Sequence, residues 1–92
     1  MSLLFEISPY LERILDKLER KDRVLAIAIR KKIKQIIGSD AASIEHFKNL
    51  RHDLSHLKRV RMGSFVLVFR LEGDTVIFED FNHHDRIYKK RL

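Results

Sequence analysis

The chain has 92 residues with a formal net charge of +6, and hydrophobic residues make up 45% of it. This length predicts one domain over residues 1–92, and the composition is that of a folded protein rather than a disordered one. The chain contains no cysteine, which excludes disulfide bonds and thiolate metal sites, and its longest apolar run, residues 24–29, is too short to span a bilayer. We therefore expect a cytoplasmic protein whose positive charge favours a polyanionic or acidic partner, although an ordinary solvated surface would carry the same charge.

The N-terminal residues predict a strand followed by a helix. Residues 3–7 form a short apolar run that is typical of a strand. Ser8 can cap a helix with its side chain, and Pro9 suits the first helical position. Apolar residues then recur at intervals of three and four, which predicts a helix with one buried face formed by Leu11, Ile14, Leu15 and Leu18.

A second helix follows the charged residues 19–22, which predict a turn. Asp22 can cap this helix, and Gly38 ends it. Its apolar residues again share one face and are predicted to point inward: Leu25, Ile29, Ile33, Ile36 and Ile37. Two amphipathic helices joined by a short turn form a helical hairpin.

The spacing of apolar residues changes in the second half of the chain. Residues 43–50 predict one or two helical turns inside an otherwise irregular stretch, residues 39–56. Beyond it the apolar period falls to two, which predicts strands joined by tight turns at residues 63–64 and 72–74. The three predicted strands are residues 57–62, 65–71 and 75–81. They form an antiparallel meander, because short turns reverse the direction of the chain.

The middle predicted strand indicates how this sheet meets the helices. Alternate residues of a strand lie on the same face, so one face is formed by Phe65, Leu67, Phe69 and Leu71. We expect that face to pack against the helical hairpin, and the face with Val66, Val68 and Arg70 to lie opposite. The residues from Asp85 onward predict a short basic C-terminal tail. The expected fold is α+β, with a strand, a helical hairpin and a three-stranded meander in the order β-α-α-β-β-β.

Two segments in the second half resemble the toxins of the RelE/ParE superfamily. Residues 54–69 (LSHLKRVRMGSFVLVF) show the family's leucine-rich lead-in, basic strand, glycine turn, aromatic residue and apolar strand in that order. Residues 50–55 (LRHDLS) are particularly similar to the YoeB branch, and residues 82–88 (NHHDRIY) resemble the frequent closing motif Gly-His-Arg-x-x-Val-Tyr. The predicted order of elements is also that of the family. The resemblance covers nearly the whole chain, and its specific part lies within residues 50–89.

The resemblance implies a fold, a function and a partner. It implies the RelE-like fold and the toxin of a type II toxin–antitoxin module, held inactive by an acidic antitoxin. Such toxins enter the ribosomal A site and cleave mRNA without a metal or another cofactor. The ribose 2′-hydroxyl attacks the adjacent phosphate and produces a cyclic phosphate and a free 5′-hydroxyl. This reaction needs a group that takes the 2′-proton, positive charge near the phosphate, and a group that protonates the leaving oxygen.

Basic residues of the first meander strand are the candidates for contact with that phosphate. Arg59 and Arg61 are two residues apart, so both side chains leave the same face of a strand, and Arg61 aligns best with the family's basic strand. Fixed guanidinium groups suit a phosphate that gains negative charge in the transition state. Lys58 should point to the opposite face and is a weaker candidate. The alternative is that these cations form a surface that binds the acidic residues of an antitoxin.

Residues near the C-terminus are the candidates for proton transfer and contact with a base. His83 occupies the family's closing histidine position, and an imidazole exchanges protons near neutral pH. His84 stands where many relatives have an arginine and can serve as a cationic substitute. Tyr88 matches the closing tyrosine, which suits stacking on a base, and Lys89 adds a basic group beside it. Structural roles are the alternative for these histidines and for the tyrosine, which can anchor the C-terminus on the sheet.

One position departs from the family pattern. Relatives usually carry a catalytic arginine directly after the aromatic residue that opens the second meander strand, whereas Phe65 is here followed by Val66. This departure lowers the expected rate, and a Val66→Arg variant should then cleave faster. Arg70 lies on the same strand face and is a candidate to reach part of that space.

Two alternatives to ribosome-dependent cleavage stay open. The first is a ParE-like inhibitor of DNA gyrase, because the superfamily shares a fold but not a target. Val66 favours this alternative, whereas His83 and Tyr88 favour the nuclease. The second is a non-catalytic member that binds RNA or an antitoxin.

Histidines and aspartates also raise the question of a metal site. His52 and His56 are four residues apart, and Asp53 and residues 83–85 add further potential ligands. No established zinc pattern is present, however, and ligand spacing alone is weak evidence. We therefore predict no metal.

Overall fold

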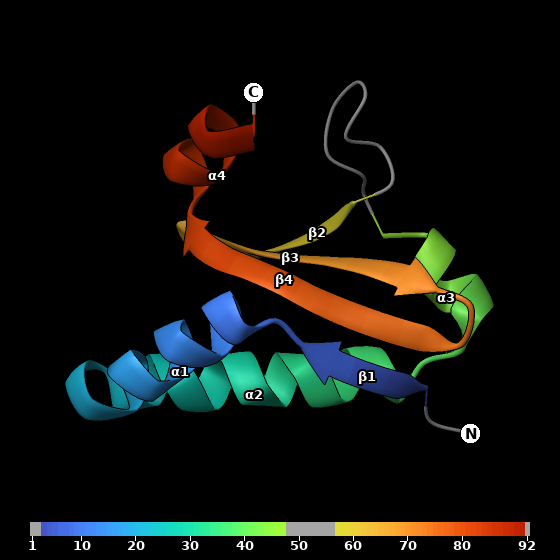
Figure 1. The fold of residues 1–92 in the computed structure, drawn as a ribbon, viewed down its shortest axis with the longest axis horizontal. Coiled ribbons are helices and arrows are strands. Elements are labelled where there is room, and N and C mark those ends of the chain that lie inside the picture. Colours follow the sequence, from blue (N-terminus) through green and yellow to red (C-terminus); the bar gives the residue numbers. More distant parts are fainter. Residues whose placement is uncertain (1–2, 48–56, 92) are drawn as a thin grey trace.

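The computed structural model describes residues 3–47 and 57–91, and Figure 1 shows how their helices and strands are arranged. The elements in chain order are β1 (Leu4–Ile7), α1 (Pro9–Lys21), α2 (Arg23–Ile37), α3 (Ala41–Glu45), β2 (Lys58–Met62), β3 (Phe65–Glu72), β4 (Thr75–His83) and α4 (His84–Arg91). The expected α+β fold is confirmed, with the helical hairpin of α1 and α2 on one side of a sheet. Within the described residues, no helix combines the length and the apolar character that spanning a bilayer requires.

The strands of the described residues form one mixed sheet in the order β1-β4-β3-β2. β2, β3 and β4 are antiparallel neighbours, as the predicted meander requires, whereas β1 pairs in parallel with β4. Gly63 and Gly73 open the two tight turns with φ angles of 63° and 62°, a conformation that residues with a side chain rarely adopt. β4 extends two residues beyond its predicted end, because Asn82 and His83 continue to pair with the start of β3.

Side-chain caps set the starts of the first two helices, as predicted. Ser8 Oγ accepts a hydrogen bond from the Leu11 N–H at 3.1 Å, and Asp22 Oδ1 accepts one at 3.2 Å from a backbone N–H in the first turn of α2. α1 continues through the charged cluster to Lys21, so Asp22 alone separates the two helices. The turn is therefore shorter than predicted, because charged side chains on the exposed face of a helix do not interrupt it.

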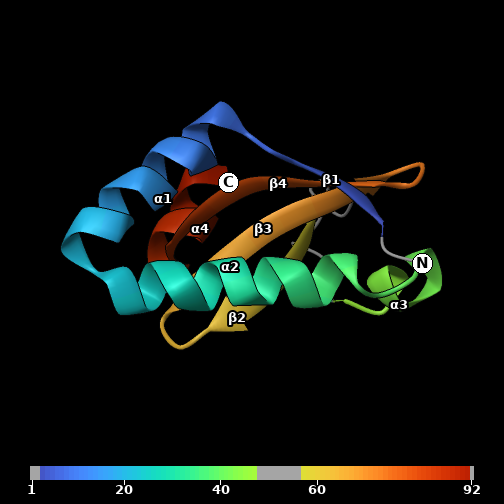
Figure 2. The ribbon, with the colours of Figure 1, turned by 90° about the horizontal axis from the view of Figure 1, so that it is seen from below.

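The main core lies between the sheet and the helical hairpin, and Figure 2 shows from below how α2 crosses in front of the sheet. The predicted inner face of β3 is confirmed, since Leu67 and Phe69 are fully buried and Phe65 and Leu71 pack at the margin. The other buried members of this core are Leu11, Leu15, Ile29, Ile33, Ile36, Ile44, Val76, Phe78 and Phe81. Each such aliphatic or aromatic side chain stabilises the fold by about 1.5–3 kcal/mol relative to an exposed one. Apolar burial therefore holds the hairpin to the sheet.

The opposite face of the sheet carries a second apolar cluster that the sequence does not predict. It consists of Leu57, Val66, Val68 and Ile87, each almost completely buried. Ile87 belongs to α4, which Figure 1 shows on the side of the sheet away from α1 and α2. The expectation of a short C-terminal tail is therefore wrong. A short basic helix with one fully buried anchor residue has almost no apolar periodicity, so its sequence signal is weak.

α3 starts earlier in the chain than the helical turns predicted for residues 43–50. It covers Ala41–Glu45, and residues 48–56 lie outside the described part of the chain. Asp40 Oδ1 accepts a hydrogen bond from the Ser43 N–H at 2.8 Å and thereby caps the helix. This hydrogen bond holds the pKa of the Asp40 carboxyl below its usual value, because it stabilises the charged form.

Ser8 joins the start of α1 to β4. Its hydroxyl donates to Glu79 O at 2.8 Å, at the bulge where β4 shifts its register against β3, and it also caps α1. We expect Ser8→Ala to lower the free energy of unfolding by about 1–2 kcal/mol, because a cap and a hydrogen bond are lost together. Urea denaturation followed by circular dichroism measures this loss. Ser8→Thr keeps the hydroxyl and is the matched control, and an alanine variant as stable as the wild type would contradict the double role.

Candidate active site at the turn between β2 and β3

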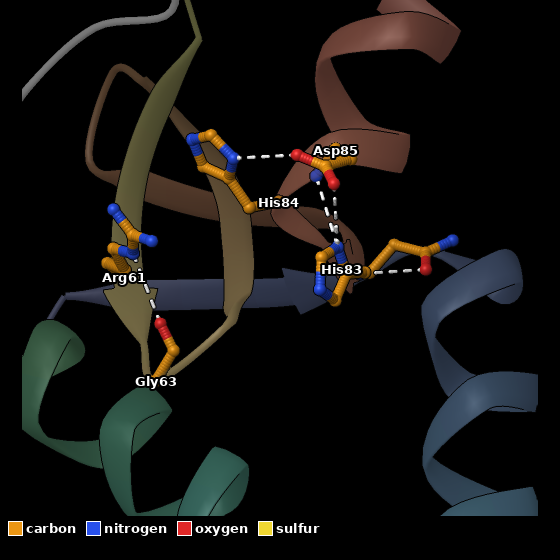
Figure 3. A network of polar contacts seen from close by, with 6 residues as sticks. Arg61, Gly63, His83, His84 and Asp85 are labelled. Atoms are coloured by element: carbon orange, nitrogen blue, oxygen red, sulfur yellow. Dashed lines mark hydrogen bonds and ion pairs between the residues drawn. The ribbon is translucent and has the colours of Figure 1, made fainter.

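The two family-like motifs meet at the turn between β2 and β3. Arg61 Nε donates a hydrogen bond to Gly63 O at 3.1 Å, and the His84 N–H donates one to Ser64 O at 2.8 Å. The basic strand and the start of α4 are thereby bound to adjacent carbonyls of one turn, and Figure 3 shows Arg61, Gly63 and His84 in this region. We call the end of β2, this turn and the start of α4 the turn site.

Arg59 and Arg61 leave the same face of β2, as strand alternation predicts. They pair with Val68 and Val66, whose side chains lie under α4. Arg61 is exposed and Arg59 is half-buried. At the outer edge of β2 both arginines line a hollow of about 480 Å³ together with Val60, His46 and Phe47. Two guanidinium groups on one face of an edge strand form a cationic surface next to the turn.

Lys58 lies apart from this cationic surface. It pairs with Phe69, a residue of the main core, and is 8% exposed. The predicted opposite direction of Lys58 is therefore what the structure shows. The sheet therefore separates Lys58 from the face of Arg59 and Arg61, so Lys58 lies outside the turn site, and its contact with RNA stays a prediction.

His83 and His84 occupy different environments although they are adjacent in sequence. His83 ends β4, pairs with Phe65 and packs edge-on against its ring, with the ring centroids 5.9 Å apart. It therefore lies on the sheet face of the main core rather than on the face of Arg61. His84 opens α4, and in Figure 3 its ring lies on the side of Asp85 nearer Arg61, whereas the His83 ring lies below Asp85 in this view.

Asp85 contacts both histidines through different atoms. Its backbone N–H donates to His83 Nδ1 at 3.2 Å, and its Oδ2 lies 3.9 Å from the same nitrogen. Its Oδ1 lies 3.4 Å from His84 Nδ1. His83 directly precedes α4 and binds the amide of its second residue, so it acts as the N-cap of this helix. Asp85 lies in the first turn of α4, where the helix dipole stabilises a carboxylate.

Arg70 lies near the end of β3 that is away from the turn site, where two glutamates bind it. Its Nε donates to Glu79 Oε2 at 2.8 Å, and it also forms an ion pair with Glu72. The hydrogen bond to Glu72 raises the pKa of the Arg70 guanidinium above its already high usual value. Arg70 is four residues from Val66 along the strand, a separation of about 13 Å at about 3.3 Å per residue. The expectation that Arg70 reaches the space beside Val66 is therefore wrong, because strand geometry and two glutamates hold it elsewhere.

The remaining candidates lie on α4 or outside the described residues. Lys89 is exposed on α4, and Tyr88 belongs to the same helix, although its side chain lies outside the described part of the structure. The potential metal ligands His52, Asp53 and His56 also lie outside it. Among the residues that the structure does describe, no group of three or more histidine, cysteine, aspartate or glutamate side chains is arranged to hold a metal ion.

Known proteins of similar sequence decide the family. No family model matches the chain. A curated relative from Methanocaldococcus jannaschii, named as the toxin RelE4, is 48% identical over 89 residues, with 94% of this chain and 90% of the relative covered. The chain belongs to the RelE toxin superfamily. An uncharacterized protein from Methanosarcina mazei is 36% identical over 85 residues, with 86% of this RelE-family chain and 99% of that protein covered.

A solved structure agrees on the RelE-like fold. The toxin–antitoxin complex RelBE2 from Mycobacterium tuberculosis contains a chain that matches with a TM-score of 0.68 at 21% sequence identity. The match covers 91% of this chain and 100% of that one. The RelE-like fold implied by the motifs is thus confirmed in three dimensions.

Val66, at the position where the motif resemblance leads us to expect an arginine, is fully buried. It packs with Leu57, Val68 and Ile87 beneath α4. An arginine at this position would bring a guanidinium into an apolar cluster and push α4 away from the sheet. The burial of Val66 gives the substitution Val66→Arg a structural cost that the sequence does not show, and the faster cleavage expected of this variant stays a prediction.

The sequence by itself assigns Asp85 no role beyond that of a potential metal ligand. Because the sequence does not predict a helix here, it does not show that Asp85 lies in the first turn of one. Recognising α4 supplies the missing signal, since an acidic residue in the first turn after a capping side chain is typical of a helix start. Asp85 is thus a member of the turn site that motif comparison does not find.

The capping role of His83 can be separated from its ring packing. We expect His83→Ala to lower the free energy of unfolding by about 1 kcal/mol, because α4 loses its N-cap. His83→Asn keeps a side chain that caps helices well and should recover most of this loss. Urea denaturation of the two variants measures the difference. Equal losses would show that His83 stabilises the fold through its contact with Phe65 instead.

Proposed function

We propose that this RelE-family toxin is a ribosome-dependent endoribonuclease that cleaves mRNA and so inhibits translation. The observation that carries the proposal is the placement of Arg61, which is exposed and bound to the turn that also binds the start of α4. A phosphate that approaches this turn meets a guanidinium from β2 and an imidazole from α4. Metal-free transesterification of RNA uses groups of these two kinds.

The arrangement supports attack by the ribose 2′-hydroxyl on the adjacent phosphate. Negative charge grows on the phosphate oxygens during attack, and a guanidinium stabilises it through charge-assisted hydrogen bonds. The bond from Arg61 Nε to Gly63 O orients the planar group without neutralising it. Arg59 adds a second positive charge on the same face. Tyr88 and Lys89 follow on α4, and we assign them contacts with a base and with the RNA backbone.

The charge of the chain suits a ribosomal target. A net charge of +6 favours binding to RNA, because each phosphate contact releases condensed counterions. A toxin that acts on ribosomes works in the cytoplasm, so the proposed target also sets the proposed location. The chemistry itself needs no cofactor, since the nucleophile is part of the substrate.

Removal of the Arg61 guanidinium tests this chemistry. We expect Arg61→Ala to slow mRNA cleavage on translating ribosomes by about 10²–10³-fold, because charge stabilisation in the transition state is lost. Arg13→Ala removes an exposed arginine from α1 instead and should cleave like the wild type. Primer extension on ribosome-bound mRNA measures the rate and locates the cut. Equal rates for the two variants would contradict the role of Arg61.

DNA gyrase is the alternative target, and one observation favours it. Val66 stands where the motif resemblance leads us to expect a catalytic arginine, and this fully buried apolar side chain supplies no charge to the turn site. A ParE-like toxin would stall DNA replication while translation continues. If the wild-type chain acts on cells in this way and leaves ribosome-bound mRNA intact, the nuclease proposal fails and the gyrase alternative replaces it.

We also propose that an acidic antitoxin covers the turn site. The net charge of +6 and the exposed Arg61 and Lys89 support this, because an extended acidic segment would pair with them. The likeness of the fold to a chain of the RelBE2 toxin–antitoxin complex adds support.

The antitoxin proposal is tested by co-expression with a neighbouring gene for a short acidic protein. We expect a stable complex in gel filtration that weakens as the ionic strength rises, because salt screens exposed ion pairs. Recovery of the isolated chain alone, from cells that it does not harm, would contradict both the partner and the toxin role.

A further inference from the structure

The junction of β4 and α4 places two histidines around one aspartate (Figure 3). His83 Nδ1 accepts a hydrogen bond from the backbone N–H of Asp85 at 3.2 Å, whereas His84 Nδ1 lies 3.4 Å from the carboxylate oxygen Oδ1. A backbone N–H only donates, and an ionised carboxylate only accepts. The two neutral rings are therefore held with their protons on different nitrogens.

His83 carries the proton of its neutral ring on Nε2. Its Nδ1 must be unprotonated to accept the hydrogen bond from the Asp85 N–H. Nδ1 is then the basic nitrogen, and it already caps α4. A proton taken from the substrate at Nδ1 would break this cap, and Nε2 has no lone pair to offer. His83 is thus badly arranged to act as a base, although it occupies the family's closing position.

His84 has the opposite arrangement. The Asp85 carboxylate accepts from Nδ1–H, so the basic lone pair of the neutral ring is on Nε2. The His84 side chain is 34% exposed, and Figure 3 shows its ring on the side of Asp85 nearer Arg61. The His84 N–H is bound to Ser64 O, next to the carbonyl that binds Arg61. A carboxylate, a basic ring nitrogen and a guanidinium thus belong to one turn site.

From this geometry we propose that His84 takes the 2′-proton during mRNA cleavage and that Asp85 is its positioning residue. The inference rests on the proposed nuclease function and names the base of that reaction. A carboxylate bound to Nδ1 holds the ring in the tautomer that accepts a proton at Nε2, and it stabilises the imidazolium that forms. His83 has a different task, which is to cap the helix that carries His84 and Asp85.

Water acts as the second proton carrier in the proposed cleavage step. The 2′-oxygen forms a bond to phosphorus, and the bond between phosphorus and the 5′-oxygen breaks. The 2′-proton moves to His84 Nε2, and the leaving 5′-oxygen takes a proton from water. The resulting hydroxide removes the proton from the imidazolium and restores neutral His84. The products are a 2′,3′-cyclic phosphate and a 5′-hydroxyl, and no oxidation or reduction takes place.

The cleavage rate should depend on the protonation of His84. Among the described residues, the Asp85 carboxylate contacts the His84 ring and also lies 3.9 Å from His83 Nδ1, and Figure 3 shows Arg61 of β2 in the same region. A protonated imidazole cannot accept the 2′-proton, so cleavage should slow as the pH falls. We call this slowing the acid limb of the rate profile.

Nitrogen NMR on the full chain tests the two tautomers without ribosomes. At a pH where the imidazoles are neutral, the ring ¹⁵N shifts should report Nε2–H for His83 and Nδ1–H for His84. Asp85→Ala discriminates between them, because it removes the carboxylate and keeps the backbone N–H. His84 should then lose its preference for Nδ1–H, while His83 keeps Nε2–H. An Nε2–H ring at His84 in the wild type, or no response of His84 to Asp85→Ala, would overturn the assignment.

Cleavage on translating ribosomes tests the base directly. We expect His84→Gln to slow cleavage by about 10²–10⁴-fold and to abolish the acid limb. Asp85→Ala should cause a smaller loss, and His83→Asn should retain the acid limb because His84 is intact. Circular dichroism and antitoxin binding verify that each variant is folded.

Failure of His84 as the base can be distinguished from failure of the proposed nuclease function. If His84→Gln cleaves as fast as the wild type, or if only His83→Asn abolishes the acid limb, the assignment of the base is wrong and the nuclease function stands. If the wild-type chain does not cut ribosome-bound mRNA at all, the nuclease function fails, and His84 as its base fails with it.

Discussion

The burial of β3 on both faces is the constraint on which the rest of the structure depends. Leu67 and Phe69 lie in the main core beneath α1 and α2, whereas Val66 and Val68 lie under α4. A slip of one residue would move the large side chains into the layer under α4 and the small ones into the main core. Neither layer would then be well packed, because each is filled by side chains of one size. The register of β2 and β4 against β3 is fixed for this reason. The direction of each strand residue in the turn site follows from that register.

The register sorts residues that look equivalent in sequence into different environments. On β2 it sends Arg59 and Arg61 to the face of α4 and Lys58 to the face of the main core. On β4 it places His83 beside Phe65, on the face of the main core. His84 follows as the first residue of α4, so the two adjacent histidines belong to different elements.

The arginines of this basic chain are held by different kinds of partner. Arg70 is paired with Glu72 and Glu79, and Arg30 lies 2.8 Å from a carboxylate oxygen of Glu19. These carboxylates offset the positive charge of both side chains. Arg61 is instead bound to a backbone carbonyl, which orients a guanidinium and leaves its charge available to an anion. The kind of partner thus distinguishes Arg61 from Arg30 and Arg70.

The sequence by itself determined the features that depend on neighbouring residues. The caps at Ser8 and Asp22, the buried faces of both long helices, the three meander strands and the glycine turns all follow from local spacing and backbone preference. The order of the motifs within residues 50–89 was also sufficient to indicate the RelE-like fold, which the relatives and the solved structure confirm.

Only the tertiary structure decided how the turn site is assembled. α4 packs on the sheet through one fully buried residue, Ile87, whose apolar partners lie on β3 and just before β2. One buried residue gives no apolar periodicity, so the sequence does not predict this helix. The burial of Val66 follows from the same packing. The different hydrogen-bond partners of His83 and His84 depend on where β4 ends and α4 begins, and that boundary is set by pairing with β3 and by the bond to Ser64. These features arise from contacts between residues far apart in sequence, whereas the periodicity of a sequence reports mainly on contacts between near neighbours.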